Sequence, residues 1–506
     1  MLYINGNDLT LQQVVDVVRK EEEVALAPDA IEGVKEARQL VEDLLAKDEV
    51  VYGITTGFGN LANVMIPEEK VEELQENLIL SHACGVGDIL PVEVVKAMML
   101  LRANALVKGN SGIRLETLQL LVDMLNSGIT PVVYSQGSVG SSGDLVPLAH
   151  MVLVMLGKGE AYYKGERIPG GQALENEGLK PITLQAKEGL ALINGTQCMT
   201  ALGALGVYDA IKLAKTADIC TALTMEGLQG IPDAYDERIH KLRPHPGQLG
   251  AAQNIRAILK DSKLVYREDR DKVQDAYTLR CTPQVHGASK DAIEYVKGIV
   301  ERELNSVTDN PLIFPKDGVV FSGGNFHGQP VALGMDFLGI AISELGNISE
   351  RRIERLVNAD LSGLPPFLTP ESGLNSGYMI AQYTAASLVS ENKVLAHPSS
   401  VDSIPTSANQ EDHVSMGTIG ARKMRKMLTN VENVMSVELL TAAQAIEFRD
   451  TDKLAPGTRA AYELIRSEVP ALSEDRYLAP EMHKMQEMIH SGQIIEAVEE
   501  VVGTLS

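Results

Sequence analysis

Cysteine is scarce in this chain of 506 residues. The four cysteines, Cys84, Cys198, Cys220 and Cys281, are scattered, and no two of them form a CxxC pair. So few thiols in so long a chain do not make a disulfide framework, which favours a reducing compartment. The first residues also lack a basic stretch followed by an apolar one, so we expect no secretion signal and a cytoplasmic location.

Basic residues are also few, because 45 Lys and Arg stand against 68 Asp and Glu and give a formal net charge of −23. Phosphate binding requires clustered Lys and Arg, so this balance argues against a nucleic-acid partner. Metal-binding motifs are missing as well: there is no HExxH, and the ten histidines show no ligand spacing with cysteine. We therefore expect neither a nucleic acid nor a metal ion as a partner of this chain.

Residues 189–208 carry no charge and are long enough to resemble a membrane span, which needs about 20 apolar residues. The stretch nevertheless contains Asn194, Thr196, Gln197 and four glycines. Exposed amide and backbone groups are costly in lipid. We expect a buried helix preceded by a polar site, and no membrane association.

Long proline-free stretches rich in Ala, Leu, Met and Ile predict helices at residues 332–361, 378–395 and 422–448. Strand patterns are sparse and predict one hairpin at residues 161–168 and another at residues 312–321, which turns at Asp317-Gly318. The predicted fold is mainly α, with a few short β-hairpins. We expect an N-terminal portion (residues 1–200) and a long-helix bundle with the C-terminal region (residues 201–506), forming one continuous catalytic unit.

The most informative stretch is residues 137–150, Gly-Ser-Val-Gly-Ser-Ser-Gly-Asp-Leu-Val-Pro-Leu-Ala-His. Gly143 has no side chain, so its backbone nitrogen can fold back onto the carbonyl of Ser141. Ser142, between them, carries a hydroxyl that can leave as water. These ingredients suit a cyclic electrophile made from the backbone itself, although a flexible Gly/Ser loop is the commoner fate of such a composition. The three spaced glycines lack the lysine of a phosphate-binding loop, so we expect no nucleotide here.

This loop resembles the Gly-Ser-Val-Gly-Ala-Ser-Gly-Asp-Leu-Ala-Pro-Leu motif of the histidine and aromatic amino-acid ammonia-lyases. The resemblance runs nearly end to end. It includes, in the family's order, residues 52–59, 81–85, 194–196, 274–280, 308–311, 324–328 and 410–416. The family cyclises and dehydrates an Ala-Ser-Gly tripeptide to methylidene-imidazolone (MIO). This chain differs at the first position, Ser141, whose side chain takes no part in ring closure, so we expect an MIO that carries a hydroxymethyl group.

The resemblance implies roles for several residues outside the loop. Tyr52 matches the base that removes the β-proton, although a free tyrosine titrates near 10 and would need a lowered pKa or a strongly coupled departure of the amine. Arg280 offers two parallel donors to a substrate carboxylate. Asn194 resembles a residue that hydrogen-bonds near the MIO and the substrate amine. The residues that resemble its pocket neighbours are Gln274, Tyr277 and Phe326. Ordinary packing, capping or surface roles are the alternatives for each.

Two residues bear on the choice of substrate. His82 is compatible with an imidazole or with a tyrosine phenol. Glu411 is the more selective residue, because histidine ammonia-lyases carry this acid and a carboxylate can accept a hydrogen bond from an imidazole N–H. Burying that charge against a phenyl ring would cost several kcal/mol. Met379 resembles the apolar wall of the same pocket. The family therefore implies deamination of L-histidine to urocanate, by a homotetramer whose active sites each draw residues from three chains.

Three alternatives remain open at this point. A tyrosine or phenylalanine ammonia-lyase, or a 2,3-aminomutase, would use the same cofactor. A dinucleotide-binding protein would use the GxGxxA pattern of residues 57–62, although residues 62–67 break the helix that should follow it. A noncatalytic helical scaffold would use its acidic surface to bind partners, but would not account for a reactive tripeptide, a pocket arginine and a matched acid in one order.

Overall fold

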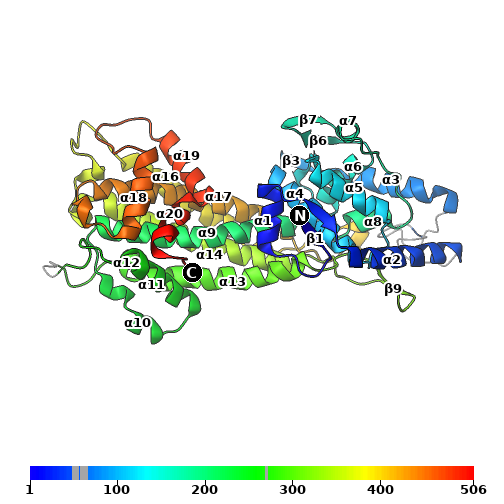
Figure 1. Ribbon diagram of the computed structural model, residues 1–506, viewed down its shortest axis with the longest axis horizontal. Coiled ribbons are helices and arrows are strands. Elements are labelled where there is room, and N and C mark those ends of the chain that lie inside the picture. Colours follow the sequence, from blue (N-terminus) through cyan, green and yellow to red (C-terminus); the bar gives the residue numbers. More distant parts are fainter. Residues whose placement is uncertain (48–55, 57–66, 268–271) are drawn as a thin grey trace. The chain divides into compact units, whose positions relative to one another are not determined.

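The computed structural model describes residues 1–47, 56, 67–267 and 272–506. Within this part of the chain the fold is mainly helical with a few short strands, as the sequence predicts (Figure 1). The chain forms two compact units. The first comprises Met1–Leu205, Lys297–Asp336 and Pro398–Arg422, and the second comprises Gly206–Val296, Phe337–His397 and Lys423–Ser506.

Four long helices contribute residues to both units. They are α9 (Gln197–Gly227), α13 (Thr282–Leu304), α14 (Gln329–Val357) and α17 (Gly417–Ile446). At 1.5 Å per residue these helices are about 35–46 Å long. The first stretch of the first unit ends close to the expected boundary at residue 200. The first unit also includes Lys297–Asp336 and Pro398–Arg422, because the long helices return the chain to it. A division of the sequence into 1–200 and 201–506 does not show these two stretches.

The first unit holds the shorter helices of the N-terminal part and every strand found among the described residues. Its helices are α1 (Leu11–Lys20), α2 (Pro28–Ala46), α3 (Val71–His82), α4 (Val92–Leu106), α5 (Leu115–Asn126), α6 (Leu145–Met155), α7 (Gly170–Asn176) and α8 (Glu188–Ile193). The second unit adds α10 (Glu237–Lys241), α11 (Pro246–Ile258), α12 (Tyr277–Arg280), α15 (Ala359–Ser362), α16 (Met379–Leu395), α18 (Pro456–Glu468), α19 (Ala479–Ser491) and α20 (Gln493–Val502). Short 3-10 turns lie at Glu68–Lys70, Pro232–Tyr235, Pro366–Leu368, Ser407–Asn409 and Thr451–Lys453.

Helix α17 shows how the apolar pattern positions a helix in the core. Apolar side chains recur along it at spacings of three and four, as a core-facing stripe requires. The members of this stripe are Met424, Met427, Leu428, Val431, Val434 and Met435, and all are buried. Helix α14 is the one helix in the described part of the chain that is long and apolar enough to cross a membrane, and 67% of its most apolar window is buried inside the protein. Core helices of globular proteins can be equally long and apolar. Because most of its apolar window is buried, helix α14 is part of the core.

Both predicted hairpins are confirmed. Strands β6 (Glu160–Tyr163) and β7 (Glu166–Pro169) pair antiparallel, as do β8 (Leu312–Phe314) and β9 (Val319–Phe321). The pattern did not predict the other short pairs. These join β1 (Leu2–Ile4) to β2 (Val24–Leu26) in parallel, β3 (Val86–Ile89) to β5 (Tyr134–Gln136), and β4 (Thr130–Pro131) to β6. These strands are too short to show an alternation, and unlike the two hairpins they pair with partners that no tight turn joins to them.

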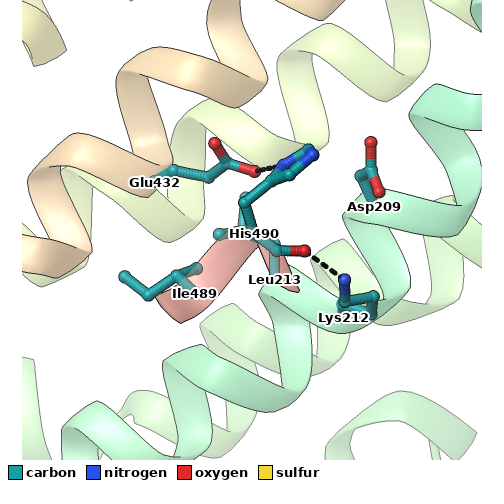
Figure 2. Close-up of a pocket in the computed structure, with 6 residues that line it drawn as sticks. All are labelled: Asp209, Lys212, Leu213, Glu432, Ile489 and His490. Carbon is teal, nitrogen blue, oxygen red and sulfur yellow. Dashed lines mark hydrogen bonds and ion pairs between the residues drawn. The ribbon is translucent and has the colours of Figure 1, made fainter. Parts of the chain in front are cut away.

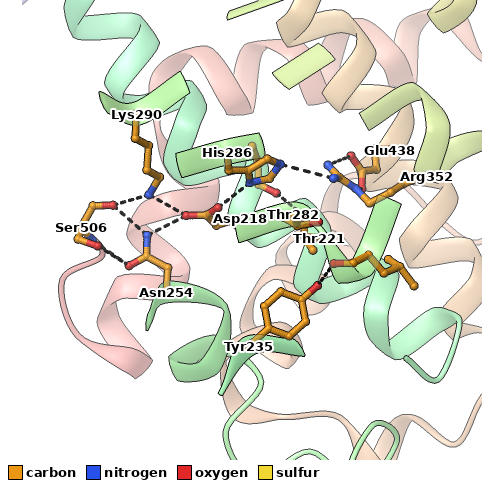
Figure 3. A network of polar contacts seen from close by, with 12 residues as sticks. Asp218, Thr221, Tyr235, Asn254, Thr282, His286, Lys290, Arg352, Glu438 and Ser506 are labelled. Atoms are coloured by element: carbon orange, nitrogen blue, oxygen red, sulfur yellow. Dashed lines mark hydrogen bonds and ion pairs between the residues drawn. The ribbon is translucent and has the colours of Figure 1, made fainter. Parts of the chain in front are cut away.

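The second unit is built around a buried polar network rather than a purely apolar core (Figure 3). Arg352 forms a two-pronged ion pair with Glu438, with its Nε 2.5 Å from Oε1 and its Nη2 2.8 Å from Oε2, and both side chains are fully buried. Arg352 also lies 3.4 Å from Nε2 of His286, whose Nδ1 lies 2.7 Å from Asp218. A guanidinium can only donate, so Nε2 accepts and the imidazole proton sits on Nδ1. Burial lowers the pKa of His286, which is consistent with this neutral form.

Removing one partner of the Arg352–Glu438 pair should strongly destabilise the protein. Arg352→Met leaves the Glu438 carboxylate buried without its cation, which should lower the free energy of unfolding by about 3–5 kcal/mol. Urea unfolding followed by circular dichroism measures this change. Arg238→Met, at a side chain that is 89% exposed, is the control and should leave the unfolding midpoint unchanged. An Arg352→Met protein as stable as the unmodified chain would contradict this account of the core.

Candidate active site

The predicted tripeptide, Ser141 to Gly143, lies directly before helix α6 and against the turn between α8 and α9. Asn194 Nδ2 donates a hydrogen bond to the Ser142 carbonyl at 2.8 Å, and the Asp144 amide donates to the Gly195 carbonyl at 2.7 Å. Two motifs that are 52 positions apart in the sequence therefore form one local structure. The Asn194 side chain is thus the donor to the Ser142 carbonyl, and Ser138 Oγ donates to the Gly143 carbonyl at 3.4 Å.

Glycine is required on both sides of this contact. Gly143 has a φ of +74°, a conformation that other residues rarely adopt, and a Cβ built on it would lie 2.0 Å from the Gly195 carbonyl oxygen. A Cβ on Gly195 would lie 2.4 Å from an Nη1 nitrogen of Arg102. The two backbones can approach this closely because Gly143 has no side chain, and the missing side chain of Gly195 leaves room for the Arg102 guanidinium behind the turn.

The buried Asp144 carboxylate joins the tripeptide loop to two helices that begin in the first unit. Its carboxylate accepts hydrogen bonds from Ser138 Oγ at 2.8 Å, from the Met199 amide at 2.8 Å and from the Thr418 hydroxyl. These partners lie in the loop itself and at the beginnings of α9 and α17, so one side chain ties three segments together. Burial raises the pKa of Asp144. The carboxylate does not cap its own helix, although it stands at the N-cap position of α6.

Arg102 holds the turn on which Asn194 lies, and the sequence analysis did not single it out. It is fully buried and donates to the Asn194 carbonyl at 2.9 Å and to Gln197 Oε1 at 2.8 Å. A further bond goes to the Ala191 carbonyl at the end of α8. Burial lowers the pKa of Arg102 to about 10. An arginine within the otherwise apolar stretch of α4 is the sequence feature that could have drawn attention to it.

Glu411 lies against the tripeptide and is not a solvated surface acid. Its Oε2 accepts from Ser141 Oγ at 2.7 Å and from Thr406 Oγ1 at 2.9 Å, and its Oε1 accepts from Ser142 Oγ at 2.9 Å. His82, at the end of α3, is half-buried, and burial lowers its pKa while the charge of Glu411 acts in the opposite direction. The structure thus brings four predicted residues, Ser141, Ser142, Asn194 and Glu411, into direct contact, with Gly143 between them and His82 within electrostatic reach.

Phe326 belongs to the same unit and is half-buried in the segment before α14. Two residues further on, the Gly328 amide donates to the Gly140 carbonyl at 3.3 Å. This bond attaches the segment that carries Phe326 to the loop that carries the tripeptide.

The remaining predicted residues belong to the second unit. Arg280 donates to Gln274 Oε1 at 2.9 Å, and its guanidinium stacks over the Tyr277 ring with its carbon 4.7 Å from the ring centroid. The Arg280 Nε is buried and has no hydrogen-bond partner among the described residues. Met379 is half-buried at the beginning of α16. These residues form a second set, and Tyr52, together with residues 57–62 of the GxGxxA pattern, lies outside the described part of the chain.

A pocket of the second unit contains none of the predicted site residues (Figure 2). It is lined by Asp209, Lys212, Leu213, Glu432, Ile489 and His490. The His490 ring lies 2.9 Å from Glu432 Oε1, and Lys212 donates to the His490 carbonyl. Asp209 pairs with Arg425, so the charged groups that line this pocket already have partners. In the residues that the structure describes, no three His, Cys, Asp or Glu side chains form a group that could hold a metal ion.

The residues around the tripeptide fit the cyclic group that the sequence implies. Gly143 is held where no side chain could stand, and the Ser142 carbonyl, which ring closure retains, already has its donor in Asn194. The Asn194 Oδ1 is buried and has no hydrogen-bond partner among the described residues, so it is available to a ligand. Asn194, Asp144 and Arg102 would hold such a group in place.

Comparison with known proteins gives the same assignment. Residues 9–467 match the model of the aromatic amino acid lyase family. A histidine ammonia-lyase of Symbiobacterium thermophilum is 59% identical over 500 residues, covering 99% of both chains. The crystal structure of histidine ammonia-lyase from Trypanosoma cruzi superimposes with a TM-score of 0.92 at 44% identity, covering 99% of this chain and 95% of that one. Tyrosine aminomutase from Streptomyces globisporus superimposes with a TM-score of 0.96 at 37% identity over the whole of both chains. The chain belongs to the aromatic amino acid lyase family and is an ammonia-lyase of that family.

Proposed function

We propose that this chain removes ammonia from L-histidine without oxidation and forms trans-urocanate, as a step of histidine degradation. One observation carries the choice of substrate: the Glu411 carboxylate lies within hydrogen-bond distance of both serine hydroxyls of the tripeptide. An acid at this place can accept a hydrogen bond from an imidazole N–H, whereas a phenyl ring would leave the charge unpaired. The high identity to relatives named histidine ammonia-lyase supports the same choice.

The cofactor of this proposal is an MIO formed from Ser141, Ser142 and Gly143. The Gly143 nitrogen bonds to the Ser141 carbonyl carbon, whose oxygen leaves as water with the two amide hydrogens of Ser142 and Gly143. The Ser142 hydroxyl leaves with its α-hydrogen as a second water. Ser141 keeps its side chain, so the ring carries a hydroxymethyl group. When formed, this group supplies an electrophilic carbon that turns the substrate amine into a better leaving group.

The surrounding residues bind and orient the substrate in this proposal. Asn194 donates through Nδ2 to the Ser142 carbonyl oxygen, where negative charge would develop, and such a preorganised donor in a buried site can lower a barrier by several kcal/mol. Its unpartnered Oδ1 is suited to the substrate ammonium. Tyr52 removes the β-proton, and Arg280 binds the carboxylate with Gln274 and Tyr277 beside it. The side-chain pocket is formed by His82, Phe326, Met379 and Glu411.

We propose that the active protein is a homotetramer that completes each site with residues of other copies. Gln274, Tyr277 and Arg280 form a cluster of their own in the second unit, and Gln274 and Tyr277 are exposed. Helix α14 also exposes a stripe formed by Leu333, Phe337 and Ile340, at 53%, 42% and 43%. Contiguous exposed apolar residues of this kind mark association surfaces. A reducing, cytoplasmic location belongs to the same proposal, and the free thiols of the four cysteines support it.

A tyrosine or phenylalanine ammonia-lyase and a 2,3-aminomutase remain the second candidate, favoured by the close structural likeness to tyrosine aminomutase. Membership of the lyase family rules out the dinucleotide-binding and scaffold alternatives.

Incubation of the purified protein with histidine, tyrosine and phenylalanine, followed by separation of the products, tests the proposal. Urocanate and ammonia from histidine are expected. A β-amino acid, or an unsaturated acid formed only from tyrosine or phenylalanine, would overturn the choice of substrate.

The cofactor proposal predicts the behaviour of Ser142→Ala. This variant lacks the hydroxyl that must leave, so its intact mass should equal the sequence mass, and ammonia release from histidine should be lost. The unmodified protein should weigh two waters less than its sequence. Ser127→Ala, at a half-buried serine at the end of α5, is the control and should retain the two-water loss. Unmodified protein that shows the full sequence mass and still releases ammonia would contradict the cofactor.

The pocket assignment predicts the behaviour of Glu411→Ala. A hydrogen bond to a charged group contributes about 1.5–3 kcal/mol, so kcat/KM for histidine should fall by about 10–150-fold. Intact mass should still show the loss of two waters, because ring closure involves only the tripeptide. Asp412→Ala changes the neighbouring exposed acid and should leave kcat/KM unaltered. Full activity of Glu411→Ala would remove the basis for choosing histidine.

The shared-site proposal predicts complementation between two inactive variants. Ser142→Ala lacks the cofactor and Arg280→Ala lacks the carboxylate-binding group, so each should be inactive alone. In tetramers formed by co-expression of the two, some sites should combine an intact tripeptide from one chain with an intact Arg280 from another, and histidine turnover should partly return. Mixed tetramers that stay as inactive as either parent would show that each site is built from a single chain.

A further inference from the structure

The hydrogen bonds of Glu411 are divided unequally between its two oxygens. Oε2 accepts from two hydroxyls, Ser141 Oγ at 2.7 Å and Thr406 Oγ1 at 2.9 Å. Oε1 accepts from the Ser142 hydroxyl at 2.9 Å. The donors to Oε2 and the donor to Oε1 differ in one chemical respect: ring closure removes the Ser142 hydroxyl and leaves the other two in place.

We propose that Ser141 and Thr406 are positioning residues that hold Oε2 of Glu411, so that loss of the Ser142 hydroxyl turns the free Oε1 toward the imidazole N–H of the substrate. This inference rests on the proposed function. Cofactor formation then has two results. It creates the electrophile, and it removes the internal donor that occupies the acceptor needed by the substrate.

The surroundings of Glu411 are built to keep the carboxylate in this orientation. Its backbone pairs with that of Thr406, with the Thr406 amide donating to the Glu411 carbonyl at 2.9 Å and the Glu411 amide donating back at 3.3 Å. Thr406 therefore holds the residue by its backbone and by its side chain. Ser141 is 6% exposed, so its hydroxyl has little access to water as a competing partner.

Ser141 is also the position at which this chain departs from the family motif, which has alanine there. Ring closure uses the carbonyl carbon of this residue and not its side chain, so the hydroxyl persists after the ring has formed. An alanine offers no donor at this position. In Ser141 this chain therefore has a donor to Glu411 that the family motif does not provide.

The test separates the orientation of Glu411 from the chemistry of the ring. In Ser142→Ala the ring cannot form and Oε1 has no serine donor, as after ring closure. Calorimetric titration of this tetramer with L-histidinol, and with L-phenylalaninol as the ligand without an imidazole, measures recognition of the side chain without turnover. Adding Ser141→Ala should weaken histidinol binding by about 3–10-fold, the range for one hydrogen bond, and leave phenylalaninol binding unchanged.

Two further variants guard against a purely structural explanation. Ser141→Thr keeps the hydroxyl and should restore histidinol binding, and Thr406→Val, which removes the other donor to Oε2, should weaken it in the same way as Ser141→Ala. In the ring-bearing enzyme, Ser141→Ala should still lose two waters and should raise KM for histidine more than it lowers kcat. Thermal unfolding of every variant shows whether the fold is intact.

Equal histidinol affinity with and without the Ser141 hydroxyl would overturn the inference. If the unmodified enzyme forms urocanate in that case, the proposed function stands and only the positioning role fails. If the unmodified enzyme releases no ammonia from histidine and Ser142→Ala does not prefer histidinol to phenylalaninol, both the function and the inference fail.

Discussion

The candidate site depends on the close approach of two backbone segments, the tripeptide at Gly143 and the turn at Gly195. This contact leaves no room for a side chain on Gly143, and the Arg102 guanidinium leaves none on Gly195. It places the Asn194 amide on the Ser142 carbonyl and aligns the two motifs in a short parallel bridge. A reacting centre made from backbone atoms needs a surrounding backbone that does not move, since a misplacement of about 1 Å can cost about two orders of magnitude in rate.

Buried charges hold this contact in place. Arg102 supports the turn from one side and Asp144 joins the loop to the beginnings of two long helices from the other. A buried charge is costly unless it is hydrogen-bonded, and both groups have several partners. Their hydrogen bonds define the geometry of the loop and of the turn. The Arg352–Glu438 pair plays a comparable part in the second unit, where it fixes the proton of His286 on one nitrogen.

The division of the predicted site residues between two units has a functional meaning in the proposed tetramer. In that proposal the first unit supplies the tripeptide, Asn194 and Glu411, and the second unit adds Met379 to the side-chain pocket. The second carries the cluster around Arg280, which suits a carboxylate. If the two sets meet across chains, the protein must assemble in order to be active. The exposed apolar stripe of α14 then supports activity by supporting that assembly.

Much of this protein could be predicted from its sequence, because the features concerned are local. Length, apolar periodicity and local strand patterns predicted the long helices and the two hairpins, and the resemblance to the family's motifs indicated the tripeptide, Asn194 and Glu411. The other short strands escaped prediction because they show no period and no tight turn joins them to their partners. Tyr52 stays a prediction, since it lies outside the described residues.

Only the tertiary structure decided which of these residues meet. Ser141 and Glu411 are 270 positions apart, yet their side chains lie 2.7 Å from one another. Arg102 and Thr406 became visible as supporting residues in the same way. Contacts across such separations depend on how long helices return the chain to the first unit, which no local pattern encodes. The sequence thus determined the chemical groups, and the packing of the helices determined their geometry.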